Sequence, residues 1–265
     1  MIVLAVVVVP VFFRTGLFRL PRDARLPALP PAAIGGLFAA MLLAGRLGAA
    51  LVSPWAGLDA EALATDPTGA LRATAVLQIG SYGGQSLVVV LLVLLLHRAG
   101  WRPWRQVGLF PGIAAGLVVI VVAWPVVVAS TEIGAVVQQM LQGEPVEALA
   151  HRTLQMLDRG GGAWAVAVTV LAIAAAPPLE EILYRGLAHA TLRSIGMGAW
   201  PTVIGVSAIF ALMHASAAPP AALLGLFVLS LALGWARESS GSLTVPIVAH
   251  MAFNAANLAL MQVRV

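Results

Sequence analysis

Apolar segments of about 20 residues recur along this chain, and short polar stretches separate them. A helix of that length crosses the hydrocarbon core of a bilayer, and it satisfies its backbone hydrogen bonds internally. The candidate segments are 2–20, 31–53, 74–96, 108–130, 163–193, 199–216, 219–236 and 243–261. The sequence therefore predicts an all-α fold, a polytopic membrane helical bundle of about eight transmembrane helices.

The composition excludes several other classes of protein. Apolar residues make up 60% of the chain and charged residues 10%, which is too little charge for the surface of a soluble domain. The net charge is +4, but the arginines lie between apolar segments and form no patch with interleaved aromatic residues. We therefore expect the lipid bilayer, and no nucleic acid, as a partner. Because the chain has no Cys, a disulfide framework, a thiolate metal site and a Cys nucleophile are excluded.

The charges at the segment ends predict the topology. Arginines gather at alternate ends of the segments, at positions 14, 19, 22, 25, 98, 102, 105, 185, 193 and 237. The other ends carry acidic residues, at positions 59, 61, 66, 132, 144 and 147. The Arg-rich side should be cytoplasmic, which places both termini outside. Most tryptophans lie near segment ends, as in an interfacial belt, whereas Trp124 lies inside a segment and should pack against a neighbouring helix.

Three regions follow from this pattern. Residues 1–130 should form N-terminal transmembrane helices, and 2–20, which lacks a basic leading region, should remain uncleaved. Residues 131–162 should form an extracytoplasmic loop whose apolar spacing is compatible with an amphipathic helix on the outer surface. Residues 163–265 form the last four segments and contain the ionisable residues that call for a functional explanation.

Two adjacent carboxylates follow a proline pair in segment 163–193. Pro177 and Pro178 should kink this long helix. Glu181 and Arg185 are four residues apart and can pair on one face, whereas Glu180 points about 100° away. Glu180 would then suit general-base work. The alternative is an ordinary Glu–Arg pair where the helix meets water.

Two histidines and one asparagine occupy the later segments. His214 lies in segment 199–216, and its alternative role is a hydrogen bond to a nearby carbonyl oxygen. His250 and Asn254 share a face of segment 243–261 and can present two N–H donors to one developing oxyanion. Asn254 can alternatively hold helices together. Counted from the cytoplasmic ends, these groups and the acids reach similar depths, so one inner cavity can hold them all.

Three motifs in these segments resemble those of a known family. EEILYR, which begins at Glu180, resembles the motif EExxxR; FALMH, which ends at His214, resembles FxxxH; and HMAFN, which begins at His250, resembles HxxxN. These motifs characterise the CAAX prenyl endopeptidase and bacteriocin-processing (CPBP) family of intramembrane proteases, which includes Rce1-like and Abi proteins. The resemblance covers roughly 163–261, and Tyr184 stands where the family more often has Phe.

The resemblance implies an intramembrane endopeptidase and a role for each matched residue. Glu180 would be the general base that activates water, and Glu181, oriented by Arg185, would support it. His214 would assist with the water or with the proton transfers. The substrate would be a membrane-anchored peptide or protein. The composition is typical of a GC-rich bacterial genome, so we expect the cell (inner) membrane, a site that opens to the cytoplasmic side, and a substrate other than a prenyl protein.

The resemblance also implies that His250 and Asn254 hold the oxyanion. It favours a metal-free mechanism without a cofactor, although two His and two Glu would also suit zinc. The chain lacks the H-E-x-x-H motif of common zinc proteases. Two alternatives to proteolysis stay open: a non-catalytic protein of the bacteriocin-immunity type, and a transporter with a proton relay.

Overall fold

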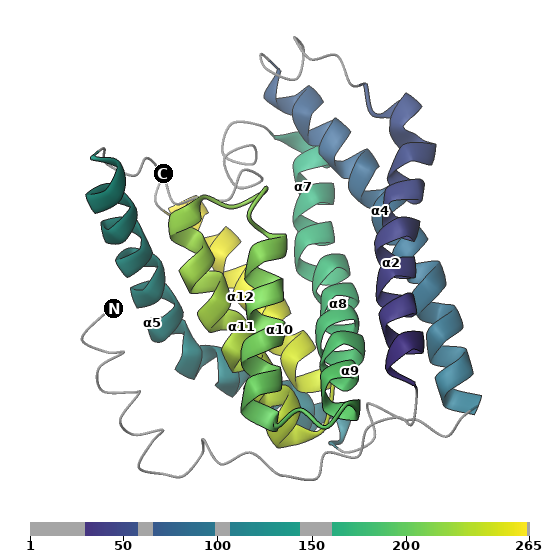
Figure 1. The fold of residues 1–265 in the computed structure, drawn as a ribbon. Helices are drawn as coiled ribbons and strands as arrows, with labels where there is room; N and C mark the ends of the chain where they lie inside the picture. Colours follow the sequence, from purple (N-terminus) through teal and green to yellow (C-terminus); the bar gives the residue numbers. More distant parts are fainter. Residues whose placement is uncertain (1–29, 58–65, 99–106, 144–160, 264–265) are drawn as a thin grey trace. The chain divides into compact units, whose positions relative to one another are not determined.

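The computed structural model describes residues 30–57, 66–98, 107–143 and 161–263, and the regular structure within these ranges is helical, without a β-strand (Figure 1). The predicted all-α class is therefore confirmed. Within these ranges five helical segments are long and apolar enough to cross a membrane: Gly35–Trp55, Pro67–Leu95, Leu109–Gln142, Gly162–Ser194 and Pro220–Ser240. Two shorter apolar helices are Ala199–Met213 and Thr244–Leu260. The predicted segment 2–20 lies outside the described residues.

The chain divides into two compact units. The first unit comprises Met1–Leu26, Pro103–Arg152 and Leu192–Phe253. The second unit comprises Pro27–Arg102, Thr153–Thr191 and Asn254–Val265.

In the second unit, helices α2 (Pro31–Val52) and α4 (Pro67–Arg98) pack closely against each other (Figure 1). Small residues permit this approach. A Cβ atom on Gly80 would collide with the backbone carbonyl of Gly48, and one on Gly84 would collide with that of Ala44. Close backbone contact of this kind gives van der Waals attraction, which has to hold helices together in lipid.

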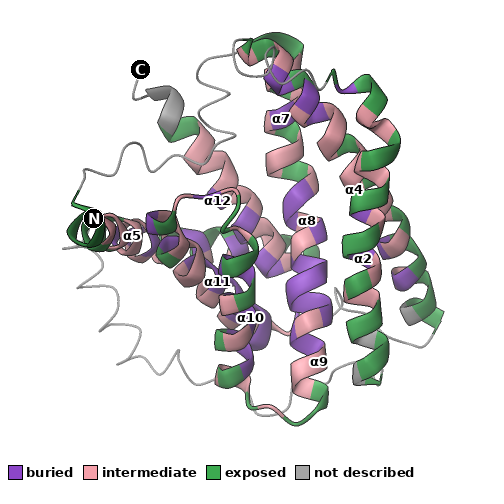
Figure 2. Ribbon diagram, turned by 45° about the horizontal axis from the view of Figure 1, so that its top comes forward, coloured by how far each residue is buried: buried purple, intermediate pink, exposed green. Residues whose placement is uncertain are grey.

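A helical run from Gly162 to Ser194 completes the described core of the second unit, to which it belongs as far as Thr191. It consists of α7 (Gly162–Val170), the π-helix η2 (Leu171–Ala175), α8 (Ala176–Glu181), the π-helix η3 (Ile182–Ala188) and α9 (His189–Ser194). Val168 of α7 packs against Leu71 and Ala75 of α4. Helix α8 is largely buried (Figure 2). The prolines thus lie in a continuous helical run, and the π-helix η2 directly precedes α8.

A buried apolar cluster forms the core of the first unit. Around it pack α5 (Leu109–Gln142), α10 (Ala199–Met213), α11 (Pro220–Ser240) and the beginning of α12 (Thr244–Val263). The cluster consists of Ile120, Val127, Leu229, Leu233, Ala249 and Phe253. The Trp124 ring packs against Phe253, with ring centroids 5.4 Å apart. The prediction that Trp124 contacts a neighbouring helix is therefore confirmed.

Some predicted helix ends were wrong. The segment predicted to end at residue 130 continues as α5 to Gln142, because polar residues such as Gln138 and Gln139 also continue a helix; it ends at Gly143, whose φ of 74° is left-handed. Helix α11 likewise continues to Ser240 and ends at Gly241, with φ 65°. Arg237, predicted in a loop, therefore lies in the helix and is buried. The apolar set of the expected amphipathic helix, within 144–160, lies outside the described residues.

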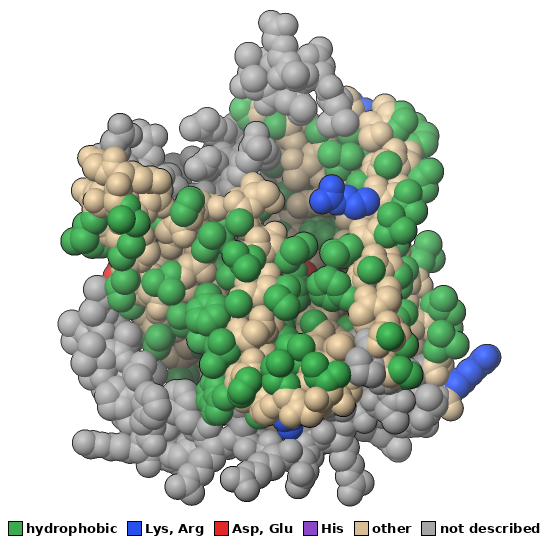
Figure 3. All heavy atoms as spheres, in the orientation of Figure 1, with side chains coloured by type: hydrophobic (Ala, Val, Ile, Leu, Met, Phe, Trp, Pro, Cys, Tyr) green, Lys and Arg blue, Asp and Glu red, His purple; other side chains and the backbone are tan. Residues whose placement is uncertain are grey.

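The outward-facing side chains of these helices are mostly hydrophobic (Figure 3). On α2, Leu43, Leu47 and Leu51 are exposed, and on α4 Leu87 is 75% exposed. So much exposed apolar surface is unfavourable in water and favourable against lipid tails. Together with the helix lengths, it shows an integral membrane protein.

Candidate active site

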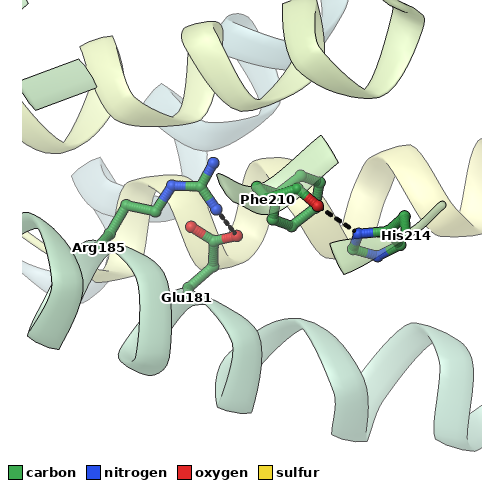
Figure 4. A network of polar contacts seen from close by, with 4 residues as sticks. All are labelled: Glu181, Arg185, Phe210 and His214. Atoms are coloured by element: carbon green, nitrogen blue, oxygen red, sulfur yellow. Dashed lines mark hydrogen bonds and ion pairs between the residues drawn. The ribbon is translucent and has the colours of Figure 1, made fainter. Parts of the chain in front are cut away.

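Helix α8 carries both carboxylates, and Glu181 forms a buried ion pair. The Arg185 Nη1 atom donates a hydrogen bond to Glu181 Oε1 at 2.7 Å, and both side chains have no solvent exposure (Figure 4). The predicted pair on one helix face is therefore confirmed. Arg185 had also been counted among the charges at the segment ends that predict the topology, but its side chain is buried. The pair fixes Glu181 in place, while the neighbouring Glu180 is only partly buried.

Helices α2 and α4 bring aromatic side chains to the segment that carries the carboxylates. Tyr184 packs edge-on against Phe38 of α2, with ring centroids 6.2 Å apart. Tyr82 of α4 lies within electrostatic range of Glu180, and α4 packs against α8. Tyr82 was not among the residues predicted from the sequence. A signal was present, because Tyr82 is one of two tyrosines in the chain and lies in the middle of a predicted span.

Asn254 makes a hydrogen bond that anchors the segment before the carboxylates. Its Nδ2 atom donates to the backbone carbonyl oxygen of Ala172, in the π-helix η2, at 2.8 Å. A contact of this kind between helices is the alternative to oxyanion binding that was considered for Asn254 from the sequence. The Asn254 amide has two N–H bonds, and this contact uses one of them. That the other N–H binds an oxyanion stays a prediction.

In the first unit, both histidines contact one aromatic ring. Phe210 of α10 is 1% exposed, and its ring centroid lies 4.5 Å from that of His214 and 5.9 Å from that of His250. Phe210 thus brings together two side chains that are distant in the sequence. His250 is buried, and His214 is partly exposed and ends α10 as its C-terminal cap.

One hydrogen bond defines the chemistry of His214. Its Nδ1 atom lies 2.7 Å from the backbone oxygen of Phe210 (Figure 4). A carbonyl oxygen can only accept, so Nδ1 must carry the proton. In the neutral ring the Nε2 atom is then left with its lone pair and can accept a proton or hold a water. The carbonyl contact that was the alternative to a functional role is therefore present, and it leaves Nε2 available for chemistry.

The predicted residues thus form three local groups. Glu181 and Arg185 pair beside Glu180, the two histidines share the Phe210 ring, and Asn254 holds Ala172. Carboxylates and Asn254 belong to the second unit, and both histidines to the first. That all of them share one cavity stays a prediction. Within the described ranges no three side chains of the metal-binding types gather, and the choice of a metal-free mechanism also stays a prediction.

A family model matches the part of the chain that contains these residues. Residues 162–256 match the family described as type II CAAX prenyl endopeptidase, Rce1-like. This match covers EEILYR, FALMH and HMAFN, the three motifs on which the sequence resemblance rested. No curated protein and no solved structure was found to match the chain.

Proposed function

We propose the chemistry of the site from the Rce1-like domain at residues 162–256. At the level of the family, this domain makes the chain a membrane protease of the CAAX prenyl endopeptidase type. A water molecule activated by Glu180 attacks a peptide bond of a membrane-delivered substrate. The observation that carries this proposal is the fully buried Glu181–Arg185 pair on the turn that bears Glu180. Burial of ionisable groups in lipid is costly, so their presence favours a functional role.

We assign different roles to Glu180 and Glu181 because their surroundings differ. Glu181 is held by Arg185 as a charge-assisted hydrogen bond partner and supports the local structure. Glu180 is partly exposed and next to it in the chain, so it is the carboxylate with access to water. Glu180 accepts a proton from the water while the water oxygen bonds to the substrate carbonyl carbon.

The resulting tetrahedral intermediate carries a negative oxygen, which needs hydrogen-bond donors. We assign this role to the ring N–H of His250 and to the second N–H of Asn254, whose first N–H is held by Ala172. When the intermediate collapses, the C–N bond breaks, and the proton held by Glu180 passes to the leaving nitrogen. The lone pair on His214 Nε2 helps to position the water or to relay this proton.

The family match and the arginine distribution support proposals about the substrate and about the side of the membrane to which the site opens. A protease of this family acts on membrane-associated proteins or peptides, and we propose that the substrate here is a bacterial membrane peptide other than a prenyl protein. We also propose that the site opens to the cytoplasmic side of the cell membrane, as the distribution of arginines predicts.

The test compares the peptides in membranes of cells that express the wild type, Glu180→Ala or His97→Ala. His97 lies near the end of α4, outside the proposed site, and serves as the matched control. We expect uncleaved substrates to accumulate, and their new peptide termini to disappear, with Glu180→Ala alone. Identical termini in all three samples would refute a catalytic Glu180 and favour a non-catalytic protein of the immunity type.

A further inference from the structure

The backbone hydrogen bonds of η2 leave one carbonyl oxygen in need of a donor. The N–H of Ala176 bonds to the oxygen of Leu171, five residues earlier, as in a π-helix. In a continuous α-helix the same N–H would bond to Ala172 instead. The next donor along the chain would belong to Pro177, which has no N–H. Ala172 therefore has neither its α-helical donor, which bonds to Leu171, nor a π-helical donor.

The side chain of Asn254 supplies the missing donor. Its Nδ2 atom lies 2.8 Å from the Ala172 oxygen, although the two residues are 82 positions apart. In a membrane helix a carbonyl oxygen freed by proline has to be satisfied by a neighbouring helix or by water. Both residues belong to the second unit, so this contact is internal to a compact part of the molecule.

The π-helix also sets the direction in which Glu180 points. Each residue advances an α-helix by about 100°, so accommodating one additional residue in a turn rotates the following side chains by that amount. Glu180 and Glu181 lie in α8, directly after η2. A return of η2 to α-helical hydrogen bonding would therefore turn both carboxylates away from their present direction.

We infer that Asn254 is a positioning residue for Glu180: its bond to the Ala172 carbonyl, which Pro177 deprives of a donor, holds η2 in π-helical form. This inference rests on the proposed function for its catalytic meaning. The sequence motif assigns Asn254 to the oxyanion, whereas this contact gives the same side chain a second task through its other N–H bond.

The bond itself can be detected by solid-state NMR of the full chain in lipid vesicles. The chain has two asparagines, Asn254 and Asn257, so the side-chain amide signals are easily assigned with Asn257→Ala. With ¹⁵N-asparagine and ¹³C-carbonyl alanine labels, we expect the Asn254 amide signal to dephase through the Ala172 carbon. Ala172→Ser keeps the bond but removes the label, and should reduce the dephasing. Unchanged dephasing would overturn the inference.

A double-mutant cycle tests why the bond is needed. Pro177→Ala restores a backbone N–H that can serve Ala172, so Asn254→Ala should then cost less stability. Interhelical hydrogen bonds in membranes are modest, and we expect Asn254→Ala to shift the unfolding equilibrium about threefold more in the wild-type background than in the Pro177→Ala background. Asn257→Ala should show no such coupling. Equal effects of Asn254→Ala in both backgrounds would contradict the inference.

Thiol labelling tests the positioning of residue 180. The chain has no Cys, so Glu180→Cys and Val166→Cys each introduce one thiol, and position 166 is 63% exposed on α7, before η2. In an Asn254→Ala background the maleimide reaction at 180 should change severalfold, whereas the reaction at 166 should not. A general loss of structure would change both and overturn the inference, as would no change at 180. None of these three measurements needs a substrate, so their outcome is separate from that of the proteolysis test.

Discussion

The buried pair of Glu181 and Arg185 leads to a quantitative prediction about stability. We expect Glu181→Gln to destabilise the protein strongly, because the substitution removes the carboxylate that accepts a hydrogen bond from the fully buried Arg185 guanidinium. At the observed separation of 2.7 Å, Coulomb attraction is about 6 kcal/mol with an effective dielectric constant of about 20. The cost of removing both charges from water offsets part of this attraction. The loss on breaking such a pair is therefore about 3–5 kcal/mol.

Replacing both partners should cost much less than replacing one. The double variant Glu181→Met with Arg185→Met removes both desolvation costs together with the attraction, and buried pairs replaced in this way lose little or no stability. We therefore expect the double variant to be more stable than either single variant. This difference separates an interaction between charges from a simple loss of packing.

The assay is equilibrium unfolding in mixed detergent micelles, followed by the fluorescence of the seven tryptophans. Glu132→Gln serves as the matched control, since Glu132 is an exposed glutamate of α5. The control should change the free energy of unfolding by less than about 0.5 kcal/mol. The reasoning is refuted if Glu181→Gln costs no more than this control, or if the double variant is as unstable as the sum of the single ones.

Two further predictions concern packing. Gly80→Ala should cost about 1–3 kcal/mol of stability, because the new methyl group meets the Gly48 carbonyl, whereas Gly83→Ala, with open space around it, should be nearly neutral in the same unfolding assay. Phe210→Leu should keep most of the stability but lower substrate turnover about tenfold or more, because His250 loses the ring against which it is oriented. Normal accumulation of cleaved peptides with Phe210→Leu would count against that role.

Much of the site could be predicted because its signals are local. Glu181 and Arg185 are four residues apart on a helix, and helical geometry alone brings them together. The carbonyl contact of His214 is also a local one, to Phe210 in the preceding turn. The family match at residues 162–256 covers short motifs of the same kind.

Helix ends and long-range contacts could not be predicted in the same way. Helix α5 continues to Gln142 although Glu132, Gln138 and Gln139 interrupt the apolar pattern, so a search for apolar segments ends too early. Tyr82 approaches Glu180 only because α4 packs against α8, and the sequence contains no short-range sign of that packing.

The sequence by itself determined that the chain forms apolar helices in a membrane and that acids, histidines and one asparagine occur in its later helices. These properties follow from composition and from spacing within single helices. The tertiary structure decided which side chain satisfies the Ala172 carbonyl and which ring the two histidines share. Such contacts join residues far apart in the chain, and they depend on the packing of whole helices, which no local pattern encodes.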